Sequence, residues 1–192
     1  LLLLLPALPT GGHCALASDD ASTACFNRAA AREMAGDYAG ALAEYRTFIA
    51  ERPGDELAPL AAMAVANLEL LALNHPDEAV AAYDVLLDRY PTSAWAPEAA
   101  RRKGECLQGA EQWEPAGRAF GQALQLAGSS SEPPQVAWIN EVSLAAADCC
   151  DHAGDAALVI EIYESVLENP LPSEAAAMVM YRLGERYEAG EQ

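Results

Sequence analysis

Basic residues are scarce in this sequence, which has 11 Lys and Arg against 29 Asp and Glu and a formal net charge of −18. Nucleic acids and anionic membrane surfaces bind proteins through clustered Lys and Arg, so this composition argues against either as a partner. A solvated acidic shell that keeps the protein soluble is the favoured interpretation. The charge also permits a basic partner.

Motifs that carry catalysis are missing as well. The sequence has no glycine-rich phosphate loop, no H-E-x-x-H, no G-x-S-x-G and no C-x-x-C. One cluster, Asp148-Cys149-Cys150-Asp151-His152, has residue types that bind zinc. On a helix Asp148 and His152 share a face, whereas the two cysteines point about 100° apart and cannot converge on one tetrahedral centre. We therefore predict no enzyme, no small-molecule substrate, no cofactor and no metal.

Cysteine is also infrequent. Four cysteines follow residue 17, too few for a dense disulfide framework. Cys106 and Cys149 fall at equivalent points of two neighbouring predicted helices. A bridge from Cys106 to Cys149 or Cys150 stays open, and buried free thiols are the favoured interpretation.

The first 17 residues differ from the rest. Residues 1–8 are apolar and uncharged, and Ala15-Leu16-Ala17 is a small-residue site of the A-x-A type, a pattern typical of a secretory signal peptide. No initiator Met or basic leader precedes them, so we expect a truncated signal, cleaved after residue 17 and followed by a short segment, 18–21. A retained membrane anchor is the alternative, although spanning requires ~20 apolar residues. His13 argues against lipid attachment at Cys14.

From residue 22 onward the pattern is helical. Apolar residues recur at i, i+3, i+4 and i+7, no alternating β-type run appears, and Gly, Pro and Asp interrupt the pattern at regular intervals. The predicted helices are 22–35, 38–51, 57–73, 77–89, 96–109, 113–127, 135–153, 156–168 and 174–189.

One motif recurs along these helices, Ala-x-x-x-aromatic followed eight residues later by proline. Full copies begin at Ala41 and Ala79, and relaxed copies begin at Ala116 and Val159. The matching point of each preceding helix lies twelve residues earlier, at Ala29, Asn67, Gly104 and Ala147, and an unfinished copy contains Gly184. This pattern resembles the tetratricopeptide repeat, in which small residues let two helices approach closely. Asn67 departs from the pattern.

The resemblance implies an all-α fold: an α-solenoid, or right-handed superhelix, of antiparallel helix pairs, with about four and a half repeats. The expected units are 22–56, 57–93, 94–134, 135–173 and a partial unit, 174–192.

A narrower likeness covers residues 79–107, with the linker Tyr90-Pro91-Thr92-Ser93. This stretch resembles bacterial envelope tetratricopeptide proteins, namely the periplasmic coordinator of the Tol–Pal system and the outer-membrane assembly lipoprotein. The likeness implies an exported scaffold or adaptor in the periplasm or cell envelope of a bacterium. The alternative is a structural or self-association arm of a longer protein, targeting an enzyme domain elsewhere in it.

In such arrays the first helix of each pair lines the concave groove. Helical spacing predicts these partner-binding residues there: Phe26, Leu68, Leu71, Arg101, Glu105, Leu144, Asp148, Asp151, Tyr181 and Glu185. One end of the set is apolar and the other is acidic, so the expected partner is a protein or peptide with apolar anchors and basic residues. The alternative is that Leu68 and Leu71 simply cover a neighbouring helix. Membrane contact is expected only if the N-terminal segment is retained.

Overall fold

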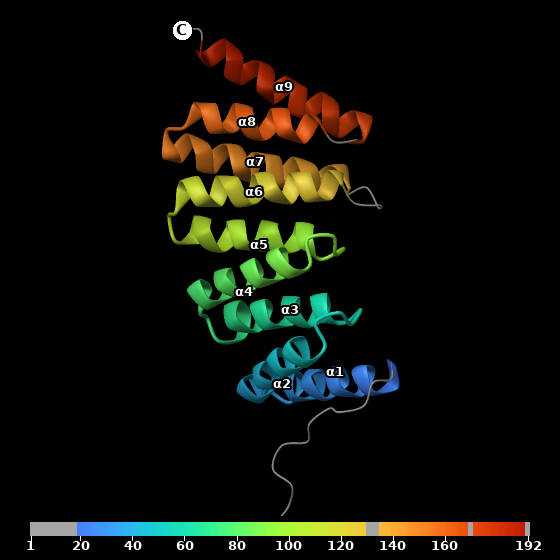
Figure 1. Ribbon diagram of the computed structural model, residues 1–192. Helices are drawn as coiled ribbons and strands as arrows, with labels where there is room; N and C mark the ends of the chain where they lie inside the picture. The colour runs from blue at the N-terminus through green and yellow to red at the C-terminus, as the bar shows by residue number, and fades with distance from the viewer. Residues whose placement is uncertain (1–18, 130–134, 169–170, 191–192) are drawn as a thin grey trace, which may run out of the picture. The chain divides into compact units, whose positions relative to one another are not determined.

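The computed structural model describes residues 19–129, 135–168 and 171–190 (Figure 1). Across these ranges all regular structure is helical, and none of the helices is long and apolar enough to cross a bilayer. The predicted signal segment, 1–17, lies outside the described residues. The chain divides into two compact units, residues 1–61 and 62–192.

The first unit contains an antiparallel pair formed by α1 (Asp19–Met34) and α2 (Tyr38–Glu51). Gly36 adopts a φ of +79° in the turn between them, a conformation that glycine reaches without strain. Asp37 then caps α2, since its Oδ1 accepts a hydrogen bond from the Gly40 amide at 3.0 Å. Tyr45, the aromatic residue of the motif, is 2% exposed, so this pair is built around the predicted residue.

The unit boundary falls within α3 (Ala58–Asn67), which continues as the π-helical η1 (Leu68–Ala72). The prediction of one regular helix over 57–73 is therefore wrong in its last turn, where the Leu73 amide donates to the Leu68 carbonyl at 3.1 Å. The widened turn directly follows Asn67, the motif residue that is not small. Its Oδ1 accepts a hydrogen bond from the Tyr83 hydroxyl at 3.0 Å, so a polar contact takes the place of close packing.

The rest of the second unit is a succession of helices, each of which packs on the next. They are α4 (Pro76–Arg89), α5 (Ala96–Gly109), α6 (Trp113–Gly128), α7 (Val136–Ala153), α8 (Ala156–Leu167) and α9 (Ser173–Gly190). Figure 1 shows α5, α6, α7 and α8 as neighbouring layers. The predicted helix ends lie within three residues of those observed, which confirms the all-α fold of antiparallel helix pairs.

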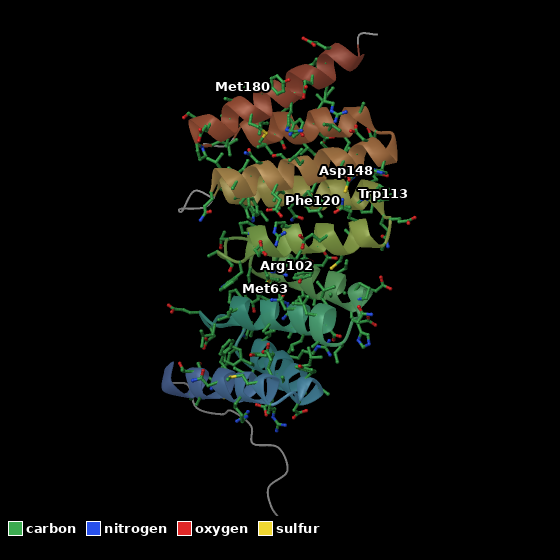
Figure 2. All side chains as sticks on the ribbon, turned by 180° about the vertical axis from the view of Figure 1, so that it is seen from behind. Met63, Arg102, Trp113, Phe120, Asp148 and Met180 are labelled. Carbon is green, nitrogen blue, oxygen red and sulfur yellow. The ribbon has the colours of Figure 1, made fainter. Side chains whose placement is uncertain are left out.

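Glycines set the closest approaches between these helices. A Cβ added at Gly104 in α5 would lie 2.8 Å from the ring of Phe120 in α6, which is labelled in Figure 2. One added at Gly117 would lie 2.8 Å from the Cys150 sulfur. A Cβ on Gly184 would meet nothing within 4 Å, so the expected close contact there is absent. Small residues therefore act as predicted where a neighbouring helix covers them.

The thiols of Cys106, Cys149 and Cys150 are free and buried, so Cys106 bridges neither of the other two. Burial raises the pKa of Cys149 to about 11 and that of Cys150 to about 12. A thiol must ionise to act as a nucleophile or metal ligand, so both act at neutral pH as small packing groups.

Candidate partner-binding face

The first helices of successive pairs in the second unit, α5, α7 and α9, are linked by side-chain contacts, and their exposed side is called here the A-helix face. Trp138 Nε1 in α7 donates to Glu98 in α5 at 3.4 Å, and Gln108 Nε2 donates to Asp148 at 3.4 Å. Both pairs are separated by 40 residues, so α5 and α7 run in the same direction in a fixed register.

A bidentate ion pair holds α7 and α9 in register. Arg186 in α9 donates from Nη1 and Nη2 to the two carboxylate oxygens of Asp151 in α7, at 2.7 and 2.8 Å. A guanidinium and a carboxylate match in this fork geometry, which orients both side chains. The charge of Asp151, one of the predicted groove residues, is thereby matched within the chain.

The charged side chains of α5 on this face pair with one another. They form, with Trp138 of α7, what is called here the closed cluster: Glu98, Arg101, Arg102, Glu105 and Trp138. Arg101 donates to Glu98 at 2.8 and 2.7 Å and also pairs with Glu105. Although burial opposes ionisation, the hydrogen bond and charge of Arg101, with Arg102 and Trp138, hold the pKa of Glu98 below its ordinary value. The hydrogen bond to Glu98 raises the pKa of Arg101, so Glu98 and Arg101 form an ionised pair at neutral pH.

The α7 and α9 part differs, because apolar side chains there are exposed among carboxylates. This open patch consists of Glu141, Leu144, Asp148, Tyr181, Glu185 and Glu188. Leu144 is 47% and Tyr181 is 68% exposed, and Figure 2 marks Asp148 on α7. The side chains of Glu141 and Asp148 are 71% and 56% exposed. A surface of this kind suits binding better than folding, since exposed apolar groups among charges contribute little to the core.

Comparison with known proteins identifies the repeats. The model of the tetratricopeptide repeat-like domain matches residues 17–141. The chain belongs to this family. No curated protein matches it. The crystal structure of MamA protein is similar in fold, with 17% sequence identity and a TM-score of 0.52, over 88% of this chain and 86% of that one. A tetratricopeptide fold is that of a protein–protein interaction scaffold, and such scaffolds are typically not catalytic.

The predicted apolar groove residues of this tetratricopeptide protein lie in different surroundings. Phe26, in the first unit, packs at 5.4 Å from the ring of Tyr45 and 6.3 Å from that of Phe48. Leu68 is 3% exposed and belongs to the core of the second unit, whereas Leu71 is 70% exposed. Of the two leucines, only Leu71 therefore offers an accessible apolar side chain, and its contact with a partner stays a prediction.

Sequence reasoning missed two residues that shape the A-helix face. Glu141 precedes the predicted Leu144 by one helical turn and Asp148 by two, so the same spacing would have found it. Helical spacing could not have indicated Trp138, because its contact with Glu98 depends on how two helices 40 residues apart in the sequence stack on each other. Another unpredicted contact is a stack of Trp113 on His152, with ring centroids 4.5 Å apart.

Two hollows and the metal-binding residue types were the other candidate sites in the described part of the second unit. Among the described residues, no group of three or more His, Cys, Asp or Glu is placed to hold a metal ion. A hollow of about 190 Å³ between α6 and α8 falls below the usual size of a ligand pocket. A second one, of about 320 Å³, is lined by the 91–94 linker, Pro97, Leu126 and Ser129 and has no charged side chain in its lining.

Proposed function

We propose that this tetratricopeptide protein is an exported scaffold or adaptor of a bacterial cell envelope, which holds a protein or peptide partner on its A-helix face. The observation that carries the proposal is the open patch, where Leu144 and Tyr181 are exposed on two helices fixed to each other by Arg186 and Asp151. A face held rigidly before binding loses little entropy when a partner docks.

Export and envelope location are supported by sequence features alone. The apolar residues 1–8 and the Ala15-Leu16-Ala17 site favour secretion, and the 90–93 linker resembles those of bacterial envelope tetratricopeptide proteins. Expression of the full gene in a bacterium, followed by cell fractionation and N-terminal sequencing, tests this. A mature N-terminus near residue 18 in the periplasmic fraction is expected, and purely cytoplasmic full-length protein would contradict export.

Partner binding is tested by two charge-matched double variants. Asp148→Lys/Glu185→Lys changes the A-helix face, and Glu161→Lys/Glu168→Lys makes the same change in exposed residues of α8 and its C-terminal cap. Each variant and the wild type are immobilised and exposed to envelope extract. We expect the captured protein to be lost only from the A-helix-face variant. Equal capture by all three proteins, or equal loss from both variants, would count against this face.

A second candidate function is favoured by α9, whose Met180 and Tyr187 are 55% and 46% exposed beside Tyr181. These side chains suit self-association or a structural arm that targets an enzyme elsewhere in a longer protein. Sedimentation of the wild type and of Met180→Glu over a range of concentrations tests the self-association. Concentration-dependent dimers that the substitution abolishes would support it, and a monomer throughout would contradict it.

A further inference from the structure

The A-helix face divides into two parts that differ in what they leave for a partner. In the closed cluster, Arg101 lies between Glu98 and Glu105, and its side chain is only 15% exposed. A partner cation there would compete with a guanidinium already held by several charge-assisted hydrogen bonds. A partner anion would face carboxylates on both sides of Arg101. The cluster is therefore poorly suited to recognise either charge.

The open patch has carboxylates with no comparable internal cation. Glu141 has a distant neighbour in Arg101, at 4.0 Å, and Asp148 lies 3.7 Å from His152, which carries charge only when protonated. Glu185 and Glu188 form no ion pair within the described part of the chain. Two cations of α9 lie near this surface. Arg186 is held by Asp151 in a bidentate pair, and Arg182, next to Tyr181, is half-buried and donates from Nε to the Met178 sulfur at 3.2 Å. The negative potential of this surface is therefore available to a ligand.

We infer that the open patch binds a basic amphipathic protein segment, with an apolar side chain seated between Leu144 and Tyr181 and Lys or Arg side chains on the flanking carboxylates. This inference rests on the proposed function and specifies the chemistry of its partner. The apolar contact supplies affinity, because Leu144 and Tyr181 lose exposed surface. The carboxylates supply selection by charge, because opposite charges raise the association rate and like charges repel.

The probe is a fluorescein-labelled peptide of about 18 residues, designed as a helix with Leu on one face and Lys on the other. Its twin carries Glu in place of every Lys. Binding to the full chain is followed by fluorescence anisotropy at low and high salt. We expect saturable binding of the Lys peptide that weakens with salt, and at least about tenfold weaker binding of the Glu peptide.

Matched variants locate the binding. Glu141→Lys/Asp148→Lys is expected to weaken binding of the Lys peptide about tenfold, and Glu161→Lys/Glu168→Lys less than about twofold. The two variants change the net charge equally, so a difference between them reports the position of the binding site. Leu144→Ala/Tyr181→Ala is expected to weaken it about tenfold with an unchanged salt dependence. Val85→Ala, an exposed apolar residue of α4, is the control and should change nothing. Circular dichroism and thermal unfolding establish that each variant is folded.

Several results would overturn the inference: equal binding of the two peptides, no saturable binding of the Lys peptide, equal weakening by both charge variants, or no effect of Leu144→Ala/Tyr181→Ala. The capture experiment on envelope extract separates this failure from that of the proposed function. A captured protein that still depends on the A-helix face would leave the function standing with a partner of different chemistry. Equal capture by the wild type and the A-helix-face variant would reject both the proposed function and this inference.

Discussion

Gly104 in α5 and Gly184 in α9 occupy the same point of the repeat motif, and their surroundings are opposite. A Cβ on Gly104 would lie 2.8 Å from the Phe120 ring, whereas one on Gly184 would meet nothing within 4 Å. Gly104 is small because α6 approaches it, and no described helix approaches Gly184 in that way. The comparison teaches that the motif marks a place for a second helix, and that the packing arises only where this helix is present.

The charges of the same two helices repeat the contrast. Glu98 in α5 accepts hydrogen bonds from Arg101, Arg102 and Trp138, so its carboxylate is part of the folded framework. Glu185 in α9 is exposed and lies beside Tyr181, whose pKa is raised first of all by its hydrogen bond to that carboxylate. The carboxylate of Glu98 is thus paired within the fold, whereas that of Glu185 forms no ion pair in the described part of the chain and faces solvent or a partner.

The largest effect expected from this contrast is that of Gly104→Ala. The added methyl group would overlap the Phe120 ring, and a buried aromatic ring has little room to move, so we expect a loss of about 1–3 kcal/mol in the free energy of unfolding. Urea denaturation measures this loss in stability, provided that the m-value is the same for the variant and the wild type. Gly109→Ala in the same helix is the control, because its Cβ would meet nothing within 4 Å. Equal effects of the two substitutions would reject the packing explanation.

An intermediate effect is expected from Glu98→Gln. The pKa of Glu98 is lowered in the folded protein, so its ionised form stabilises the fold above the ordinary Glu pKa, and this stabilisation is lost as the pH falls. At pH 7 the variant should lose about 1 kcal/mol of unfolding free energy, as is usual for partly exposed charged pairs. The difference from the wild type should shrink when the pH is lowered below about 4.

Glu185→Gln is the matched substitution in α9 for the same titration. Its carboxylate makes no ion pair within the described ranges, so at pH 7 the denaturation curve of this variant should follow that of the wild type. A pH-independent cost of Glu98→Gln, or an equal cost of both substitutions, would mean that the closed cluster contributes nothing through its charges.

Much of the fold could be predicted from the sequence, because its signals are local. Gly36, Asp37 and Pro91 interrupt the helical pattern, and the chain turns at each of them. The widened turn at 68–72 could not be predicted, because it follows Asn67, whose hydrogen bond comes from Tyr83 on the next helix. The pattern of small and aromatic residues thus gave the order of the helices, and contacts between helices decided their details.

The candidate site was predictable in part. Leu144 and Asp148 lie on the A-helix face, as helical spacing predicts, since α7 is continuous through both. The pairing of Arg101 with Glu98 and Glu105 was visible as spacings of three and four residues, a signal that sequence reasoning overlooked. Which carboxylates stay exposed depends on the stacking of α5, α7 and α9, and spacing along one helix carries no information about it.

The smallest effect, of opposite sign, is expected from Gly184→Ala. Gly184 lies inside α9 and is exposed, so Ala lowers the entropy of the unfolded chain without a clash and should add about 0.5–1 kcal/mol to the free energy of unfolding. Urea denaturation at two protein concentrations measures it. A loss of stability, growing with concentration, would show that a second copy packs against this glycine as Phe120 packs against Gly104. The two positions would then obey the same rule, with α9 covered by another chain.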